Sequence, residues 1–373
     1  MRLAVGGLIA MAAAVGVGRF VYTPILPLMV DDLGMTKSTA GLLASANFAG
    51  YLAGALLAAT SAVRGSGRRW LLAGLTASAL TTGAMGVASS TPAFMVLRFV
   101  GGAASAFGLV FASALVLDGL AAAARSELSA VHFAGVGVGI AISAVLSSAL
   151  STFGGDWRSI WLAGGAISLV AVVLVAILIP DRGGPAPAAT TRGSRIDRRL
   201  AAFVTAYGLF GFGYIITATF LVAIVRDARH DRALEPVVWL VVGLTAAPSV
   251  AFWTWVARRT GIERAFALAC VAEAIGVAAS VMHTTAAVLL GAALLGGTFM
   301  GLTALGLIGA RRLSAGDPRS TLALMTAAFG LGQIVGPAFA GLVHDATGSF
   351  VLPSLTAVAG LLLGGLLALA MSK

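Results

Sequence analysis

The 373-residue sequence has few of the side chains on which catalytic and metal sites are usually built. Its single cysteine, Cys270, excludes a disulfide framework and a thiolate metal site. The four histidines share no metal-ligand spacing, and neither lysine, Lys37 or Lys373, belongs to a glycine-rich phosphate-binding loop. We therefore expect no metal, haem, nucleotide or other cofactor, no ATPase of its own and no enzymatic activity.

Charged residues are also scarce, at 10% of the chain, whereas a soluble domain carries roughly 25%. Hydrophobic residues make up 59%, and the mean hydropathy is +1.00. The net charge of +10 is spread over short loops between apolar stretches, which argues against a nucleic-acid partner. The composition predicts an integral membrane protein surrounded by the lipid bilayer, and we expect it to be a monomer.

Twelve apolar stretches are long enough for transmembrane helices, which need about 20 residues. The sequence therefore predicts an all-α integral membrane protein with twelve transmembrane helices. The first stretch follows Arg2 but is too long for a signal peptide, and eleven further stretches come after it. The twelve cover approximately residues 3–30, 38–62, 70–90, 93–117, 128–152, 157–180, 200–225, 236–257, 265–283, 286–309, 320–343 and 350–371.

The longest polar segment, residues 181–199, contains Pro, Gly and Thr before a basic end and predicts a flexible cytoplasmic linker. It divides the chain into an N-terminal six-helix bundle, residues 1–180, and a C-terminal six-helix bundle, residues 200–373. With the N-terminus in the cytoplasm, seventeen Lys and Arg residues fall in inner loops and five in outer loops. The positive-inside rule thus predicts that both termini are cytoplasmic, in the inner membrane of the cell.

Glycine pairs recur in the same order in the two halves, six spans apart. The matching pairs are Gly16 and Gly18 with Gly211 and Gly213, Gly101 and Gly102 with Gly296 and Gly297, and Gly135 and Gly137 with Gly330 and Gly332. The first match aligns Arg19 with Tyr214 and Tyr22 with Thr217. Two parallel six-helix repeats with a binding site between them are typical of transporters.

An isolated arginine, Arg19, lies inside the first span and is followed by Tyr22, Thr23, Pro24 and Pro27. A charge at membrane depth costs a few kcal/mol or more, so it rarely faces lipid. Prolines bend a membrane helix, which is tolerated beside protein or a water-filled cavity. Because Arg19, Tyr22 and Thr23 share one face of a helical wheel, we expect this face to line a polar cavity. The alternative is that Arg19 is buried against neighbouring carbonyl groups for packing alone.

Four motifs along the chain have counterparts in one family. They are Gly-x-Gly-Arg-Phe-x-Tyr-Thr-Pro-x-Leu-Pro from Gly16 to Pro27, Arg98 with Gly102, Gly-Arg-Arg from Gly67 to Arg69, and Gly332 to Pro337. With the twelve spans, they make the whole chain resemble the major facilitator superfamily of transporters, and the first motif resembles a compact, poorly characterised bacterial branch. In that family the loop before Gly-Arg-Arg begins with an acidic residue, which this sequence lacks. The resemblance implies that spans 1, 4, 7 and 10 line a central cavity, and that Arg98 is tied to proton coupling.

The two arginines inside the spans lie at similar depths. Arg98 lies six residues beyond Pro92, which opens the fourth span, and therefore roughly 9 Å below its outer end. Arg19 is in the same half of the membrane, about 7 Å away in depth. Two guanidinium groups without an acid in that half are suited to bind a small organic anion through forked hydrogen bonds. The alternative for Arg98 is that it clamps the carbonyl groups of a helix end.

The candidate site residues fall into two sets. The candidate substrate-binding residues are Arg19, Tyr22, Thr23, Arg98, Tyr214, Thr217 and Thr298, with Asn47 and Tyr51 as weaker candidates. Glu273 is the only carboxylate well inside a span, and burial favours the neutral carboxyl form, which suits a proton carrier; a carboxyl group bonded to a neighbouring helix is the alternative. The other candidates for proton coupling are Arg98, Gln333 and His132. Five tryptophans are expected to be anchors at the membrane interface: Trp157, Trp161, Trp239, Trp253 and Trp255.

The sequence therefore predicts a secondary active transporter that works by alternating access and is coupled to protons, with a small organic anion as the favoured substrate. Aromatic residues in the cavity-lining spans leave a multidrug or amphipathic-solute exporter as the alternative within this class. A non-transporting membrane sensor or assembly subunit is the alternative from another class. It is disfavoured because the loops are short and no soluble output domain is present in the sequence.

Overall fold

The computed structural model describes residues 1–60, 62–181, 197–228, 231–313 and 318–371. Within these ranges every regular element is a helix, and the helices form twelve spans in the predicted order. Ten of the spans are long and apolar enough to cross a membrane, and α4 (Gly67–Met85) and α10 (Ile262–Ser280) are the two that are not counted among them. The predicted all-α membrane fold with twelve helices is confirmed. Residues 182–196, most of the expected linker, lie outside the described part of the chain.

The chain separates into two compact units. Unit 1 comprises Met1–Gly34 and Ala46–Ala189, and unit 2 comprises Met35–Ser45 and Thr190–Lys373. The boundary falls within one helix, α3 (Lys37–Ala58), whose first turns pack in unit 2. The sequence places the whole of this span in the first half of the chain, because covalent order alone gives no sign of contacts made by its first turns.

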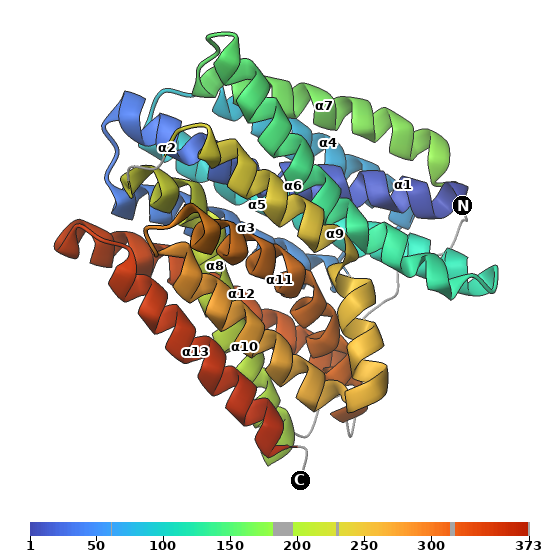
Figure 1. The fold of residues 1–373 in the computed structure, drawn as a ribbon. Coiled ribbons are helices and arrows are strands. Elements are labelled where there is room, and N and C mark those ends of the chain that lie inside the picture. The colour runs from blue at the N-terminus through green and yellow to red at the C-terminus, as the bar shows by residue number, and fades with distance from the viewer. Residues whose placement is uncertain (61, 182–196, 229–230, 314–317, 372–373) are drawn as a thin grey trace. The chain divides into compact units, whose positions relative to one another are not determined.

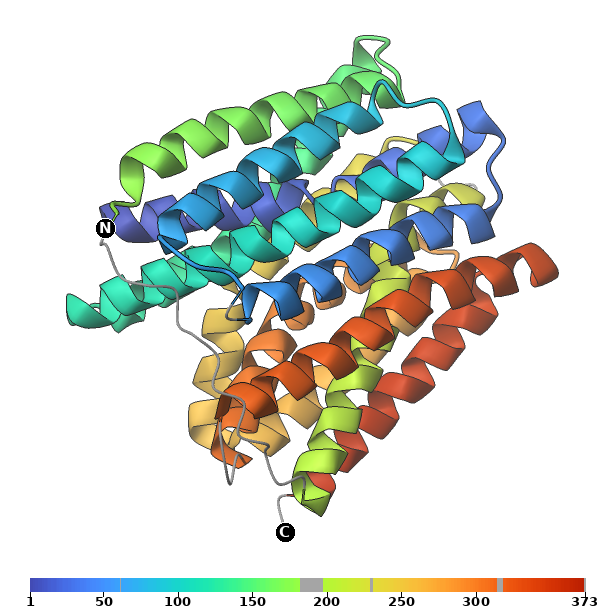
Figure 2. The ribbon, with the colours of Figure 1, turned by 180° about the vertical axis from the view of Figure 1, so that it is seen from behind.

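Unit 1 is built around its first span, which is interrupted. The span consists of α1 (Arg2–Met11), the π-helix η1 (Ala12–Val17) and α2 (Tyr22–Leu33). It packs against α6 (Ser129–Thr152), while α4 lies between α5 (Thr91–Ala122) and α7 (Trp157–Leu178), as Figure 2 shows from behind. A short 3₁₀ turn, η2 (Ser126–Leu128), joins α5 to α6.

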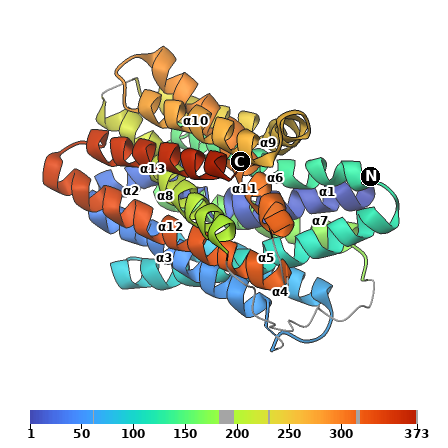
Figure 3. The same cartoon turned by 90° about the horizontal axis from the view of Figure 1, so that it is seen from below.

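Unit 2 repeats this packing with the later helices. It contains α8 (Arg198–Asp227), α9 (Leu234–Thr260), α10, α11 (Thr285–Leu313), α12 (Pro318–Thr347) and α13 (Val351–Ala370). Here α8 lies between α12 and α13 (Figure 3), and α11 packs against α9 and α10 (Figure 1). The pairing of the seventh span with the eleventh thus corresponds to that of the first with the fifth in unit 1, as the glycine repeat suggests.

Local sequence signals set where several of these helices begin and end. The carboxylates of Asp156 and Asp197 cap α7 and α8 by accepting backbone hydrogen bonds from Ser159 and Leu200, both at about the third helical position. Ser90 caps α5, with a proline in the first turn, and Gly34 ends α2 at a φ of 60°. The three side-chain caps satisfy backbone N–H groups that a helix leaves open at its start.

Glycines bring the helices of unit 1 close together. A Cβ at Gly102 of α5 would lie 1.9 Å from the carbonyl oxygen of Asn47 on α3, and a Cβ at Gly16 of η1 would lie 2.5 Å from the Cα of Gly139 on α6. No side chain fits at either contact. Such backbone approaches are the main source of packing between helices in a bilayer, where lipid competes for apolar surface.

The N-terminus of α3 is fixed by an aspartate that lies far away in the sequence. The carboxylate of Asp345, near the end of α12, accepts hydrogen bonds from the backbone N–H groups of Lys37 and Ser38 at 3.0 and 2.9 Å. The third N–H group, that of Thr39, donates to the hydroxyl of Thr36 at 3.1 Å. All three contacts are within unit 2, and they satisfy the first three open N–H groups of the helix.

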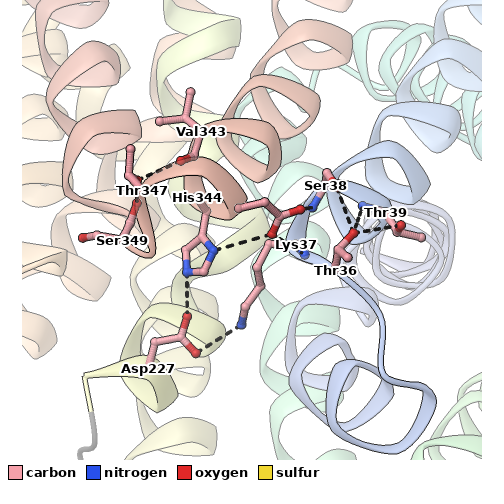
Figure 4. A network of polar contacts seen from close by, with 10 residues as sticks. Thr36, Lys37, Ser38, Thr39, Asp227, Val343, His344, Thr347 and Ser349 are labelled. Carbon is pink, nitrogen blue, oxygen red and sulfur yellow. Dashed lines mark hydrogen bonds and ion pairs between the residues drawn. The ribbon is translucent and has the colours of Figure 1, made fainter.

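Charged side chains surround this helix terminus (Figure 4). Lys37 pairs with Asp227, at the end of α8, with a nitrogen–oxygen distance of 3.1 Å. The other carboxylate oxygen of Asp227 lies 3.2 Å from Nε2 of His344. Further along α3, the hydroxyl of Ser45 donates to the carbonyl of Ile334 at 2.6 Å. These contacts attach residues 35–45 to α8 and α12 and explain why the first turns of α3 belong to unit 2.

The tryptophans differ from their expected role. Trp157, Trp161 and Trp239 are at most 1% exposed, so the prediction that they anchor the membrane interface is wrong for these three. Trp157 donates its indole N–H to Asp32 at 2.7 Å, and Trp161 stacks on the ring of Tyr22. Hydropathy alone does not distinguish a tryptophan at the interface from one buried between helices.

Candidate functional site

The first span is broken at the position of its arginine. Upstream, the N–H of Gly18 donates to the carbonyl of Ala13, five residues back, which is the π-helical pattern. Downstream, Pro24 has no N–H to offer, and α2 begins anew at Tyr22, so that Pro24 lies in its first turn. Arg19 therefore lies in the turn between η1 and α2, residues 18–21, where backbone N–H groups bond to carbonyl groups four and five residues back. The regular helical wheel assumed from the sequence does not hold there.

The second arginine reaches the backbone at this break. In a regular helix the N–H of Thr23 would donate to the carbonyl of Arg19, but here it donates to that of Phe20 at 3.2 Å. The guanidinium of Arg98 instead lies 3.5 Å from the carbonyl oxygen of Arg19, in hydrogen-bonding geometry. The side chain of Arg98 thus helps to satisfy the carbonyl group of Arg19. This contact corresponds to the alternative role given for Arg98 above, a clamp on the carbonyl groups of a helix end.

Aromatic rings face both guanidinium groups. The Arg19 guanidinium carbon lies 4.1 Å from the ring centre of Tyr51 and 5.0 Å from that of Phe48, both on α3. The Arg98 guanidinium carbon lies 4.7 Å from the ring centre of Tyr22. Both arginine residues are buried, with exposed fractions of 6% and 3%. Cation–π contacts of this kind stabilise a desolvated charge without neutralising it.

Asn47 fixes the helix that carries Arg98. Its side-chain Nδ2 donates to the carbonyl oxygen of Arg98 at 2.8 Å, and the residue is fully buried. Thr23, the remaining predicted residue in this part of unit 1, is also buried, in the first turn of α2. The structure therefore brings Arg19, Tyr22, Thr23 and Arg98 together around the break in the first span.

In unit 2, Tyr214 lies in a stack of aromatic rings. Its ring is within 5° of parallel to those of Phe299 and Phe329, with centroids 5.7 and 5.8 Å away, and it also stacks on Phe210. The side-chain amide of Gln333 donates to the Tyr214 hydroxyl. A lone amide inside a span needs such a partner, so the sequence correctly pointed to Gln333 as a bonded residue.

The other predicted residues of unit 2 are buried polar groups. Glu273 on α10 is completely buried, beside Thr298 on α11, and neither carboxylate oxygen makes a hydrogen bond with a described residue. The Thr298 hydroxyl donates to the carbonyl of Leu294 in its own helix at 2.6 Å. Thr217 on α8 is also fully buried, and its hydroxyl has no hydrogen-bond partner among the residues described.

His132 lies neither with the residues around the break in the first span nor with the buried polar residues of unit 2. Its Nε2 lies 3.1 Å from the hydroxyl of Ser113, and its ring packs against Gly7, where a Cβ would lie 2.5 Å from the imidazole Nδ1. Gly7 belongs to α1, before the break in the first span, whereas Arg19 lies at the break. Within the described ranges, no cluster of His, Cys, Asp and Glu has the arrangement of a metal site.

Asn47 and Tyr51 were only weak candidates from the sequence, but they contact Arg98 and Arg19, respectively. Trp161, which was expected at the membrane interface, lies close to Arg98. Asn47 and Tyr51 are four residues apart and therefore share one face of α3. An amide and a phenol at this spacing in an apolar span could have indicated that this face of the helix meets polar groups. Nothing in the sequence indicated which arginine each would meet.

The fold agrees with comparisons to known proteins. Residues 11–369 match the model of a family described as an uncharacterised MFS-type transporter, YbfB. The chain belongs to this family. The transporter is also similar in fold to the crystal structure of the nucleoside transporter NupG, with a TM-score of 0.74 at 16% identity over all of this chain and 98% of that one. A bacterial homologue of the human lysosomal transporter Spinster, crystallised in an inward-facing and unoccupied conformation, gives 0.72 at 13% identity over 99% and 96% of the two chains.

Three curated relatives match parts of the transporter. A gallate transporter of Pseudomonas putida is 28% identical over 177 residues, 48% of this chain and 39% of that protein. The 4-hydroxybenzoate transporter PcaK of Acinetobacter baylyi is 30% identical over 162 residues, 42% and 34% of the two chains. A chloramphenicol resistance protein of Streptomyces lividans is 30% identical over 239 residues, 62% and 59% of the two. The transporter thus matches about a third to three fifths of the length of these relatives.

Proposed function

We propose that this transporter is a secondary carrier that moves a small aromatic carboxylate across the inner membrane by alternating access. The observation that carries the proposal is the pair of buried guanidinium groups, Arg19 and Arg98, at the break in the first span. A guanidinium group binds a carboxylate through two parallel hydrogen bonds. Discontinuous membrane helices with such groups are a recurring way to place a substrate site near the middle of a bilayer.

Aromatic surroundings favour an aromatic anion over an aliphatic one. Tyr51 and Tyr22 face the two arginines in unit 1. Flat rings of this kind offer offset-stacked or edge contacts to an aromatic ligand. Two relatives named for gallate and 4-hydroxybenzoate, both aromatic carboxylates, support this choice of substrate class.

The carrier uses a proton gradient, with Glu273 as the group that gains and loses the proton. A carboxyl group without a hydrogen-bond partner in an apolar interior is stable only in its neutral form, so its ionisation requires a change in its surroundings. Arg98, Gln333 and His132 remain candidates for the rest of the coupling pathway. In this proposal both termini are cytoplasmic, because Lys and Arg are concentrated in the loops on that side.

Export of an uncharged, amphipathic solute is the second candidate. The matched relative named for chloramphenicol resistance favours it, as do the stacked rings of Tyr214, Phe299 and Phe329, which require no charge on a ligand. The two candidates differ in one respect that is easily measured. An anion carrier depends on the charge of Arg19, whereas an exporter of neutral solutes does not.

The test is binding of benzoate to the purified protein, followed by calorimetry and by the thermal shift that a ligand of the folded state produces. Charge-assisted hydrogen bonds contribute roughly 1.5–3 kcal/mol, so Arg19→Gln should weaken binding about ten- to a hundredfold. Arg19→Lys keeps the positive charge but cannot form the two parallel hydrogen bonds of a guanidinium group, so its benzoate binding should be partly impaired. The control is Arg259→Gln, because Arg259 stacks on Trp255 at 4.2 Å but is exposed. Unchanged benzoate binding in Arg19→Gln would contradict the proposal.

A further inference from the structure

A cluster of charged side chains lies at one end of unit 2, beside the start of α3 (Figure 4). Its members come from three helices: Lys37 from the first turn of α3, Asp227 from the end of α8, and His344 and Asp345 from the last turn of α12. These helix ends adjoin the connections that follow the first, seventh and eleventh spans. An even number of spans separates the three connections, so they lie on one side of a membrane, which is the outer side in the proposed orientation.

The imidazole ring of His344 lies between two carboxylates. Its Nε2 is 3.2 Å from Oδ2 of Asp227, within hydrogen-bonding distance, and its Nδ1 is 3.8 Å from Oδ1 of Asp345, within the distance of an ion pair. A neutral imidazole carries only one N–H group, so the lone pair of its other nitrogen would face a carboxylate oxygen. An imidazolium has an N–H group on both sides. The geometry of the cluster therefore suits the protonated ring.

The charges of the cluster favour the same form of the ring. Asp227 and Asp345 both lie in the last turn of a helix, where the helix dipole is negative and a cation is stabilising. Lys37 supplies one cation, with its Nζ 3.1 Å from Oδ1 of Asp227. When the imidazole of His344 is neutral, the two carboxylates and the single ammonium group of the cluster leave one negative charge unbalanced. An imidazolium balances it.

The other described groups around His344 add no net charge. Phe350, just before α13, places its ring centre 4.3 Å from that of the imidazole, and an aromatic ring is a favourable neighbour for a cation. Arg226, which precedes Asp227 on α8, donates to the carboxylate of Glu235 on α9 at 2.8 Å, so these two charges offset each other. The side chains of His344 and Asp227 are 14% and 36% exposed, so water reaches the cluster and can exchange protons with the ring.

Next to this cluster, α3 and α12 approach each other through glycines. A Cβ at Gly41 of α3 would lie 2.1 Å from the carbonyl oxygen of Pro337, and a Cβ at Gly341 of α12 would lie 2.2 Å from the carbonyl oxygen of Lys37. No side chain fits at either point, so the two backbones lie against each other without interlocking side chains there. The polar contacts at the first turn are therefore where charge can strengthen or weaken the attachment of residues 35–45.

We propose that His344 is a pH-sensitive latch for the first turns of α3. As an imidazolium it joins Asp227 of α8 to Asp345 of α12, the carboxylate that caps α3. When the ring releases its proton to water, the two carboxylates repel each other, and residues 35–45 are held less firmly to unit 2. Histidine side chains commonly change charge between about pH 5 and 8, so the pH outside the cell would set the latch. The inference goes beyond the proposed transport of aromatic carboxylates, and only the side of the membrane rests on the proposed orientation.

The test is hydrogen–deuterium exchange of the backbone amides of residues 35–45 in the purified full-length protein, at about pH 5.5 and about pH 8.5. His344→Gln removes the charge, so at the lower pH these amides should exchange about fivefold faster than in the wild type, as the loss of one partly exposed ion pair predicts. At the higher pH the two proteins should agree within about twofold. Comparing them at the same pH cancels the intrinsic pH dependence of exchange.

Two further variants make the result interpretable. His344→Arg keeps a positive charge at both pH values and should exchange slowly at both. His283→Gln removes an exposed histidine between α10 and α11 and should behave as the wild type. If His344→Gln does not fold, His344→Arg decides, because it should exchange about fivefold more slowly than the wild type at the higher pH and equally at the lower one.

Faster exchange in His344→Gln at the lower pH alone supports the latch. Equal exchange in this variant and the wild type at both pH values, or the same difference at both, overturns it and leaves His344 as a packing residue. If only His344→Arg folds, exchange that matches the wild type at the higher pH overturns the latch as well. Benzoate binding is measured separately on the same proteins, so the latch and the proposed carboxylate transport can fail independently of each other.

Discussion

The guanidinium Nη2 of Arg98 lies 3.5 Å from the main-chain carbonyl oxygen of Arg19. The two arginines of the candidate site are therefore linked through the backbone of one and the side chain of the other. Pro24 is the origin of this link, since without an N–H at residue 24 the hydrogen-bond pattern tightens and Thr23 no longer bonds to Arg19. The side chain of Arg19 takes no part in this link, so the link and the proposed binding role use different atoms of the residue.

Restoring a donor at residue 24 should change both stability and binding. In Pro24→Ala the new N–H group bonds to the Phe20 carbonyl, and the first span becomes a more regular helix. We expect a higher melting temperature, but benzoate binding at least about fivefold weaker, because Arg19 leaves its position at the break. Pro92→Ala, in the exposed first turn of α5, is the control that should leave binding unchanged. Unaltered affinity in Pro24→Ala would show that the break does not position Arg19.

Neutralising Glu273 should separate transport from energy coupling. In Glu273→Gln the side chain stays neutral throughout the cycle, so we expect uphill accumulation of substrate in proteoliposomes to be lost. Exchange of substrate across the membrane should continue, because it requires only that the loaded carrier reorients. Thr298→Val, which alters the neighbouring residue without removing the carboxyl group, should retain accumulation. A Glu273→Gln protein that still concentrates substrate against a gradient would assign the proton to another residue.

The capping carboxylate of Asp345 should stabilise the attachment of α3 to unit 2. Asp345→Asn keeps the shape but removes the negative charge next to the first N–H groups of α3, and we expect a loss of about 1 kcal/mol in stability. Thermal unfolding measures the loss, and cleavage by a protease near residues 35–37 should become faster. Glu127→Gln, at an exposed acid in unit 1, serves as the comparison. Equal stability of the two variants would show that the cap contributes little.

The orientation in the membrane is open to a direct test. In a Cys270→Ala background, a cysteine introduced by Phe153→Cys, between α6 and α7, should react with an impermeant thiol reagent in intact cells. One introduced by Arg198→Cys, at the start of α8, should be protected until the cells are opened. Both positions are exposed in the structure, so protection reports the side of the membrane rather than burial. Labelling of Arg198→Cys from outside would reverse the proposed orientation.

Features of the fold that depend on local composition were predictable from the sequence. Apolar stretches of the right length indicate the twelve helices, and the polarity of Gln333 in such a stretch indicates its need for a partner. The π-helix before Arg19 was not predictable, because it accompanies the contact of Gly16 with the backbone of Gly139, more than 100 residues away. The cap of α3 by Asp345 was missed for the same reason, since a cap supplied by another helix leaves no local pattern.

The candidate site was predicted in part. The two arginines and Tyr22 were identified because charge and hydrogen-bonding groups are rare within apolar spans, and the structure places them around one break. Tyr51 was only a weak candidate, because the sequence does not show which neighbours a tyrosine inside a span contacts. The fold brings its ring over the guanidinium of Arg19. His132 does not lie with these residues, since its ring packs against Gly7 of α1, before the break. Its role in proton coupling stays a prediction.

Helix α3 carries Lys37 in its first turn and Asn47 ten residues later, on opposite sides of the boundary between the two units. Ten residues of α-helix form a rod of about 15 Å that resists bending. A tilt of the helix at Asn47 would therefore also move the backbone of Lys37 against Asp345. A carrier that changes the tilt of α3 would have to strain or break the hydrogen bonds of this cap at the same time.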